Sequence, residues 1–141
     1  MLVVDASALT ELLLGRTAGE RVAVHVAEHR FDIHAPHLVD VEVLAALRRV
    51  VAAGAASAAR AQEAIADLLD LPVERYPHDV LAPRIWELRE NFSAYDAAYV
   101  ALAEAVGDEP VALLTADVRL ARAVGDHVDV PVLEVTADAG F

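Results

Sequence analysis

Short apolar runs alternate with longer amphipathic segments along this chain of 141 residues. Apolar runs of the length expected for buried strands occupy residues 2–4, 111–115 and 132–135, with weaker candidates near 32–35 and 72–76. The segments between them carry alanine and leucine at helical spacing and predict helices near 6–14, 18–29, 38–53, 57–70, 79–90, 94–106 and 117–124. Continuous apolar strands that alternate with helices indicate an α/β fold, in which helices cover both faces of a parallel sheet.

Glycines mark the expected ends of four predicted helices. Gly15, Gly54, Gly107 and Gly125 each fall where a helical pattern stops, and glycine readily takes the backbone conformation that ends a helix. The chain shows no internal repeat and no domain boundary. Its length is typical of one domain with a sizeable core, so we predict a single domain over residues 1–141.

The composition indicates a folded protein. A hydrophobic content of 57% and a mean hydropathy of +0.40 argue against disorder. No apolar run approaches the roughly 20 residues needed to span a bilayer, and the N-terminus lacks the basic region of a signal peptide. The chain has no cysteine, which excludes disulfides and thiolate metal ligands. We therefore expect a cytoplasmic protein with no membrane partner.

The charge balance narrows the possible chemistry. Acidic residues outnumber basic ones by 23 to 11, and the formal net charge of −12 argues against binding nucleic acid by bulk electrostatics. An enzyme that holds RNA through a metal ion and a local group of arginines is compatible with this charge. All 11 basic residues are arginine. The absence of lysine excludes P-loop NTPases, Schiff-base chemistry and the lysine-dependent phosphoaspartate enzymes.

Four acidic residues lie where solvation alone does not explain an acid. Asp5 and Asp117 each follow a predicted strand. Asp96 and Glu42 lie near the starts of predicted helices, and Glu42 has apolar neighbours. Because ligands of a parallel sheet bind beyond the carboxyl ends of its strands, Asp5 and Asp117 should face the same edge of the sheet.

Four carboxylates gathered in one pocket would repel one another. At an effective dielectric constant of 20, two unit charges 4 Å apart repel by roughly 4 kcal/mol. Such a cluster persists only if protons are retained or if a cation neutralises it. The pattern therefore favours a site for a hard metal ion, and sites of this kind hydrolyse phosphodiesters.

Three of the four acids also have a purely structural interpretation as helix caps. Asp5 and Asp117 have the position of N-caps for the helices that follow them. Ser93 and Asp96 have capping-box spacing, although aspartate replaces the usual glutamate. Glu42 shares a helix face with apolar residues and caps nothing, so a functional role is favoured there. Only the conjunction of all four acids points to a site.

Histidines and aromatic residues give weaker signals. His25 and His29 have the spacing of two metal ligands on a helix, but no third ligand is evident, so a solvated helix face is favoured. Tyr95, Tyr99 and Phe92 are spaced to pack into the hydrophobic core, and lining a substrate groove is the alternative.

Four ordered segments of the chain resemble the PIN-domain ribonucleases, and within them the VapC-type toxins of bacterial toxin–antitoxin pairs. The segments are residues 3–9, 35–43, 93–103 and 113–121, so the resemblance covers nearly the whole chain. Each motif is weak alone, and the four in order are specific. The resemblance implies a three-layer α/β/α PIN-like domain, with a mostly parallel sheet of about five strands.

The resemblance also implies an endoribonuclease that depends on Mg²⁺, with Mn²⁺ as a plausible substitute. The residues that match the family's acidic, metal-binding quartet are Asp5, Glu42, Asp96 and Asp117. Ser7 and Thr115 match the hydroxyl positions beside two of these acids, where they would support the carboxylates by hydrogen bonds. We expect the acids to hold the metal ion directly or through water.

The partners implied by this resemblance are an RNA substrate, a cognate VapB-type antitoxin and a second copy of the chain in a homodimer. Phosphate positioning would fall to arginines, and the sequence does not rank the candidates Arg16, Arg48, Arg49, Arg84, Arg89 and Arg119. A non-catalytic PIN-like module that binds a partner, and a structure-specific DNA nuclease, are the alternatives.

Overall fold

Five parallel strands form one sheet in the computed structural model, which describes residues 1–136. The strand order is β3-β2-β1-β4-β5, and every neighbouring pair is parallel. The strands are β1 (Leu2–Val4), β2 (Ile33–Pro36), β3 (Val73–Tyr76), β4 (Leu113–Thr115) and β5 (Val132–Glu134). The predicted α/β class and five-stranded sheet are therefore confirmed. The predicted domain extends to residue 141, and residues 137–141 lie outside the described part.

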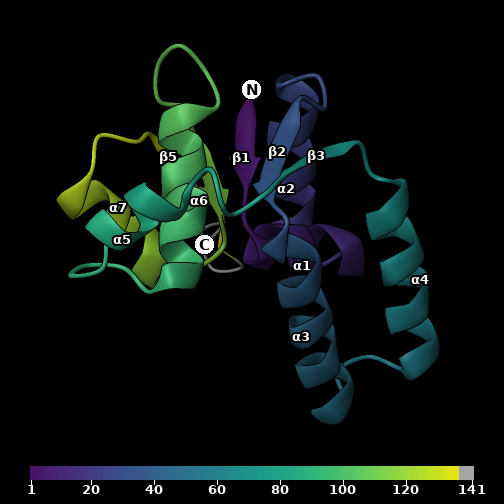
Figure 1. The fold of residues 1–141 in the computed structure, drawn as a ribbon. Helices are drawn as coiled ribbons and strands as arrows, with labels where there is room; N and C mark the ends of the chain where they lie inside the picture. The colour runs from purple at the N-terminus through teal and green to yellow at the C-terminus, as the bar shows by residue number, and fades with distance from the viewer. Residues whose placement is uncertain (137–141) are drawn as a thin grey trace.

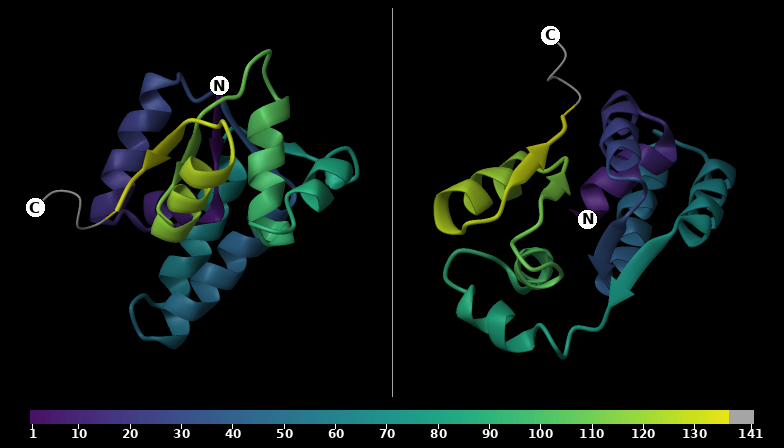
Figure 2. Two further views of the ribbon diagram at one scale, coloured as in Figure 1. Left: turned by 90° about the vertical axis from the view of Figure 1, so that its left-hand side faces the viewer. Right: turned by 90° about the horizontal axis from the view of Figure 1, so that it is seen from above.

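Helices cover both faces of the sheet (Figures 1 and 2). They are α1 (Ala6–Leu14), α2 (Thr17–Glu28), α3 (Leu38–Ala52), α4 (Ala58–Asp70), α5 (Ala82–Glu87), α6 (Ala94–Ala105) and α7 (Val118–His127). In Figure 1, α5–α7 lie on the left of the view, whereas α4 lies on the right and α3 extends below the strands. Right-handed crossovers between parallel strands produce this separation, because the chain reverses direction across the sheet after β3.

The central strands are buried on both faces. The side chains of Leu2, Val3 and Val4 in β1 are fully buried, as are Leu113 and Leu114 in β4. Residues 97–103 of α6 are all buried as well, and most are alanine, so this helix lies close against the sheet. The core thus holds rigid the strand ends that carry Asp5 and Asp117.

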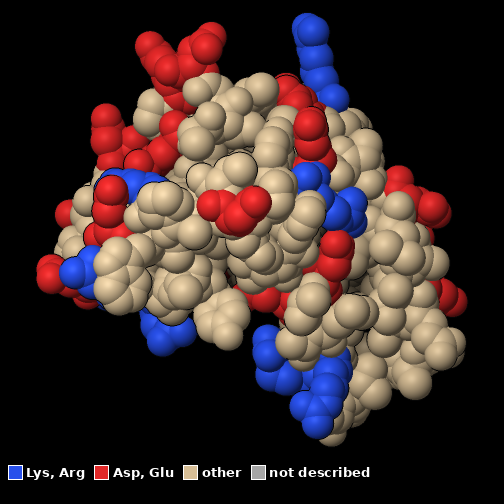
Figure 3. All heavy atoms as spheres, viewed as in Figure 1, with Lys and Arg blue, Asp and Glu red and all other residues tan. Residues whose placement is uncertain are grey.

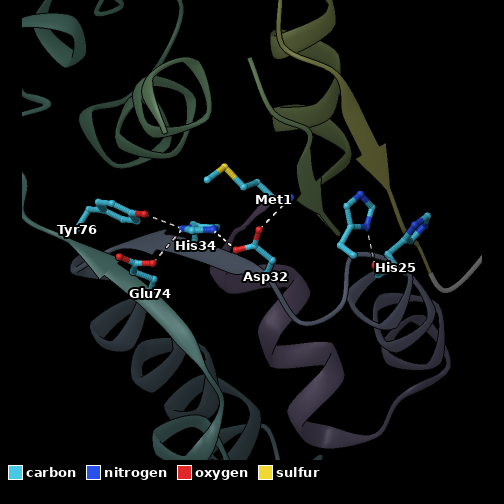
Figure 4. A network of polar contacts seen from close by, with 7 residues as sticks. Met1, His25, Asp32, His34, Glu74 and Tyr76 are labelled. Carbon is cyan, nitrogen blue, oxygen red and sulfur yellow. Dashed lines mark hydrogen bonds and ion pairs between the residues drawn. The ribbon is translucent and has the colours of Figure 1, made fainter. Parts of the chain in front are cut away.

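A polar network joins the chain start to the edge of the sheet (Figure 4). The buried ring of His34 in β2 lies 2.6 Å from Asp32 through Nε2 and 2.7 Å from the Tyr76 hydroxyl through Nδ1. Asp32 also pairs with the N-terminal amine of Met1 at 3.3 Å. The hydrogen bond with His34 is the largest of the effects that lower the pKa of Asp32. His34 is therefore satisfied within the fold.

Two of the local predictions are wrong in detail. The helix predicted over 79–90 is the shorter α5, which begins with Pro83 in its first turn, where the missing N–H of proline is tolerated. Gly125 lies inside α7 instead of ending it, because the apolar face of α7 continues through Val124 to Val128. Gly15 and Gly54 follow their helices with φ of 66° and 74°, as predicted.

No helix within residues 1–136 is long and apolar enough to cross a membrane.

Candidate active site

The four predicted acids line one cavity of about 220 Å³ at the carboxyl edge of the sheet. Asp5 follows β1 and Asp117 follows β4, the two strands that pair at the centre of the sheet. Glu42 comes from α3 on one side of the sheet, and Asp96 from the first turn of α6 on the other. The fold therefore brings together residues that are up to 112 positions apart in the sequence.

Asp5 is the most tightly held of the four acids. Its Oδ1 accepts hydrogen bonds from the Ser7 hydroxyl at 2.7 Å and from the Ala8 amide at 3.0 Å. Its Oδ2 accepts a hydrogen bond of 2.6 Å from the Thr115 hydroxyl. Asp5 as a residue is only 5% exposed, so these three donors replace most of the water that an exposed carboxylate would bind.

Ser7 and Thr115 also connect the two strand ends to each other. The Ser7 oxygen accepts a hydrogen bond of 2.9 Å from the Ala116 amide, and the Thr115 oxygen accepts one of 2.9 Å from the Asp117 amide. The two hydroxyl oxygens lie 3.2 Å apart. The turn after β1 and the turn after β4 therefore form one hydrogen-bonded unit.

Asp117 and Asp5 are helix caps as well as cavity residues. Asp117 Oδ1 accepts hydrogen bonds from the amides of Arg119 and Leu120 in the first turn of α7, at 2.9 and 3.3 Å. Asp5 caps α1 through the Ala8 amide. The capping interpretation and the functional one are thus compatible, because the cap fixes the orientation of a carboxylate that also lines the cavity.

Glu42 and Asp96 lie across the cavity from these strand ends. Glu42 Oε1 accepts a hydrogen bond of 2.6 Å from the Tyr99 hydroxyl. Asp96 lies in the first turn of α6, where its amide donates to the Ser93 hydroxyl oxygen at 3.2 Å. Both carboxyl groups are partly buried and open to the cavity.

The structure assigns a definite place in the cavity wall to two residues that the sequence left open, Tyr99 and Arg49. Tyr99 is buried, as predicted, and it is also the partner of Glu42; its position three residues after Asp96 on the same helix was a usable signal. Arg49 lines the cavity two helical turns after Glu42 on α3. Tyr95 is 65% exposed, so its predicted place in the core is wrong, because the first turn of α6 projects from the sheet at this position.

Burial and mutual repulsion raise the pKa values of three of the acids. Burial raises the pKa of Asp5 to about 6, although the hydrogen bonds from Thr115, Ala8 and Ser7 lower it. The charge of Asp117 adds to the rise. Burial also raises the pKa of Asp96, and the charge of Asp117 contributes. The pKa of Glu42 is raised by burial and by the charge of Asp96, and it is lowered by the Tyr99 hydrogen bond.

Within residues 1–136, no arginine or histidine forms an ion pair with any of these four acids. Elsewhere the chain does pair its acids, since Arg75 holds Asp40 at 2.7 Å and Arg84 holds Glu104 at 3.0 Å. Arg49 acts on the cavity from a longer range and lowers the pKa of Glu42. The cavity therefore carries excess negative charge that the protein does not neutralise.

The donor set of the cavity fits a hard divalent cation. Carboxylate and hydroxyl oxygens are the groups that Mg²⁺ and Mn²⁺ prefer. The described part of the chain contains no group of three or more histidine, aspartate or glutamate side chains already close enough together to hold a metal ion. The four acids share the cavity without closing on a common point, an arrangement that suits an ion which keeps several of its waters.

His25 and His29 make only local contacts: the His29 ring lies 2.7 Å from the His25 carbonyl, and the His25 ring lies near Glu28.

Comparison with known proteins identifies the family. A sequence profile of the PIN domain matches residues 2–125. The chain belongs to the PIN-domain family. Among the proteins similar to this chain, VapC ribonuclease Mb0985 of Mycobacterium bovis is 46% identical over 120 residues. These residues cover 85% of this chain and 88% of that protein. Ribonuclease VapC12 of Mycobacterium tuberculosis is 38% identical over 133 residues, which cover 94% and 99%.

A solved structure supports the same fold for this PIN domain. The crystal structure of PAE2754 from Pyrobaculum aerophilum superposes with a TM-score of 0.62 at 24% sequence identity. The match covers 97% of this chain and 83% of that one. Together with the sequence relatives, it confirms the resemblance to VapC-type PIN domains and the three-layer architecture.

The raised pKa of Asp5 predicts that the metal-free PIN domain loses stability as the pH rises. The folded state retains a proton on Asp5 up to about pH 6, whereas the unfolded chain releases it near its ordinary value of 3.8. Between these values the folded state binds more protons, so the free energy of unfolding falls by about 3 kcal/mol as the pH rises.

Urea denaturation in EDTA between pH 4 and 7 measures this effect. The Asp5→Asn variant has no titratable group at this position. The stability of the variant relative to the wild type should therefore increase as the pH rises from 4 to 7. An equal pH dependence for the two proteins would contradict the assignment of the pKa to Asp5.

Proposed function

We propose that this chain is a VapC-type endoribonuclease, the toxin of a toxin–antitoxin pair, which hydrolyses RNA phosphodiester bonds at the cavity described above. The observation that carries the proposal is the excess negative charge of one cavity lined by Asp5, Glu42, Asp96 and Asp117, none of which forms an ion pair within residues 1–136. Curated relatives named ribonuclease VapC support the choice of RNA as substrate.

The four acids are the residues that would hold a divalent metal ion, as VapC-type PIN nucleases generally require one. We propose Mg²⁺, with Mn²⁺ as a substitute, since both prefer oxygen ligands. When bound, such an ion supplies a Lewis acid that neutralises charge on the phosphate and makes an attacking water more acidic. Binding of the ion also requires Asp5 to release its proton, which a pKa of about 6 permits at neutral pH.

The surrounding side chains hold the acids in place for this chemistry. Ser7 and Thr115 donate to both oxygens of Asp5, so its carboxylate cannot rotate away from the cavity. Tyr99 engages Oε1 of Glu42 and leaves Oε2 as the oxygen that can orient a water or accept its proton. Arg49, in the same wall, supplies positive charge for the phosphate backbone of the substrate.

The same proposal includes two protein partners. A VapB-type antitoxin would silence the ribonuclease, in keeping with the VapC relatives. Homodimerisation stays a prediction, and it is supported by exposed apolar side chains on and beside α5, where Val80 is 68% and Trp86 is 67% exposed.

Cleavage of RNA by the purified protein in Mg²⁺ tests the proposal. Asp5→Asn and Asp96→Asn should each lower the rate by roughly 100-fold or more, because each removes a charged ligand from the cavity. Asp126→Asn is the matched control, since Asp126 is exposed at the far end of α7. Wild-type rates for both cavity variants would contradict the proposal and favour a binding module, and preferential cleavage of DNA would favour a DNA nuclease.

Tyr99→Phe tests the role of the Tyr99–Glu42 hydrogen bond. Loss of the hydroxyl leaves Glu42 without its donor and raises the pKa of its carboxyl group further. We expect the cleavage rate to fall by about 10- to 100-fold, as for other groups that orient metal-binding residues. Tyr95→Phe, on the exposed side of the same helix, should leave the rate unchanged. Equal rates for the two variants would show that Tyr99 serves only the core.

A further inference from the structure

A second cavity adjoins the carboxylate cavity and is lined by none of its four acids. It measures about 250 Å³ and shares three wall residues with the first cavity: Ser7, Ala46 and Arg49. Its remaining wall includes Thr10 of α1, Val50 of α3 and Ala116 after β4, together with an ion pair between Arg16 and Glu11. We call this second space the side cavity. It contains two arginines and a single acid, the reverse of the charge in the cavity next to it.

Three of the other candidate arginines are already engaged or line a different cavity. Arg84 pairs with Glu104 and Glu87, and Arg89 stacks over the Trp86 ring at 4.5 Å. Arg48, which precedes Arg49 in the sequence, lines an apolar groove between α3 and α4 instead. In the space-filling view, arginine side chains gather at the lower end of the molecule over α3, beside acidic side chains in a recess (Figure 3).

Arg49 is placed to act on a ligand that spans both cavities. Among residues 1–136 it forms no ion pair, although acids outnumber arginines two to one in the chain. Arg16 is held by Glu11, with NH1 3.2 Å from Oε1, and this contact directs its guanidinium along the wall of the same cavity. The two guanidinium groups thus border one space from α3 and from the start of α2.

We propose that the side cavity binds a backbone phosphate of the RNA adjacent to the phosphate that is cut, with Arg49 and Arg16 as positioning residues. A guanidinium group binds phosphate through paired hydrogen bonds. A chain with a net charge of −12 repels RNA as a whole, so local cations must hold the strand. Contacts to phosphates fix the register of the strand without reading its bases. This inference rests on the proposed function.

Short RNA substrates with one neutral methylphosphonate linkage at a time test the proposal. In the wild type, one linkage next to the cut site should be sensitive, with kcat/KM falling roughly 10-fold when its charge is removed. In Arg49→Gln the same replacement should have little further effect, because the partner charge is already absent. Arg16→Gln should show a weaker form of this result. Arg48→Gln is the control and should retain the full sensitivity of the wild type.

Binding of the same RNAs provides a second readout that a purely structural role would not change. In Arg49→Gln, the slope of log affinity against log salt concentration should fall by about one. Full wild-type sensitivity to every linkage, or an unchanged salt slope, in Arg49→Gln would overturn the proposal. A wild-type protein that binds RNA but does not cut it would contradict the proposed function instead. The difference in salt slope between the wild type and Arg49→Gln would then still test whether the side cavity binds a phosphate.

Discussion

The hydrogen bonds that Ser7 and Thr115 donate to Asp5 connect the two strand ends on which the site is built. Asp5 directly follows β1, and Thr115 is the last residue of β4. The hydroxyls of Ser7 and Thr115 also accept hydrogen bonds from backbone amides of the turn that carries Asp117. A buried carboxylate without these donors would be unfavourable by several kcal/mol. The parallel sheet supplies the shared edge, and this hydrogen-bonded unit determines where the carboxylates point.

The carboxylates themselves oppose the fold in the absence of a cation. The charge of Asp117 raises the pKa of both Asp5 and Asp96, and the charge of Asp96 raises that of Glu42. A cation bound between the acids attracts all of them and offsets these repulsions. Stability and function are therefore in conflict within this cavity, which is common where an active site must bind a cation.

The parts of this account that depend on local sequence could be predicted, and those that depend on long-range packing could not. Buried strands and helices follow from runs and periods a few residues long, and Asp5 and Asp117 were recognisable from their positions after strands. The Tyr99–Glu42 hydrogen bond joins residues 57 positions apart, so it depends on how α6 and α3 are placed across the sheet. Arg49 could not be ranked above its neighbours for the same reason, because its direction is set by the packing of α3.

The most direct test of the central claim is the anomalous X-ray signal of Mn²⁺ in crystals of the wild-type protein. The account predicts a peak inside the cavity lined by Asp5, Glu42, Asp96 and Asp117, and its loss in crystals of Asp5→Asn. A crystal saturated with Mn²⁺ that shows no peak in this cavity, or a peak bound only elsewhere on the acidic surface, would contradict the claim that these four carboxylates form one metal site.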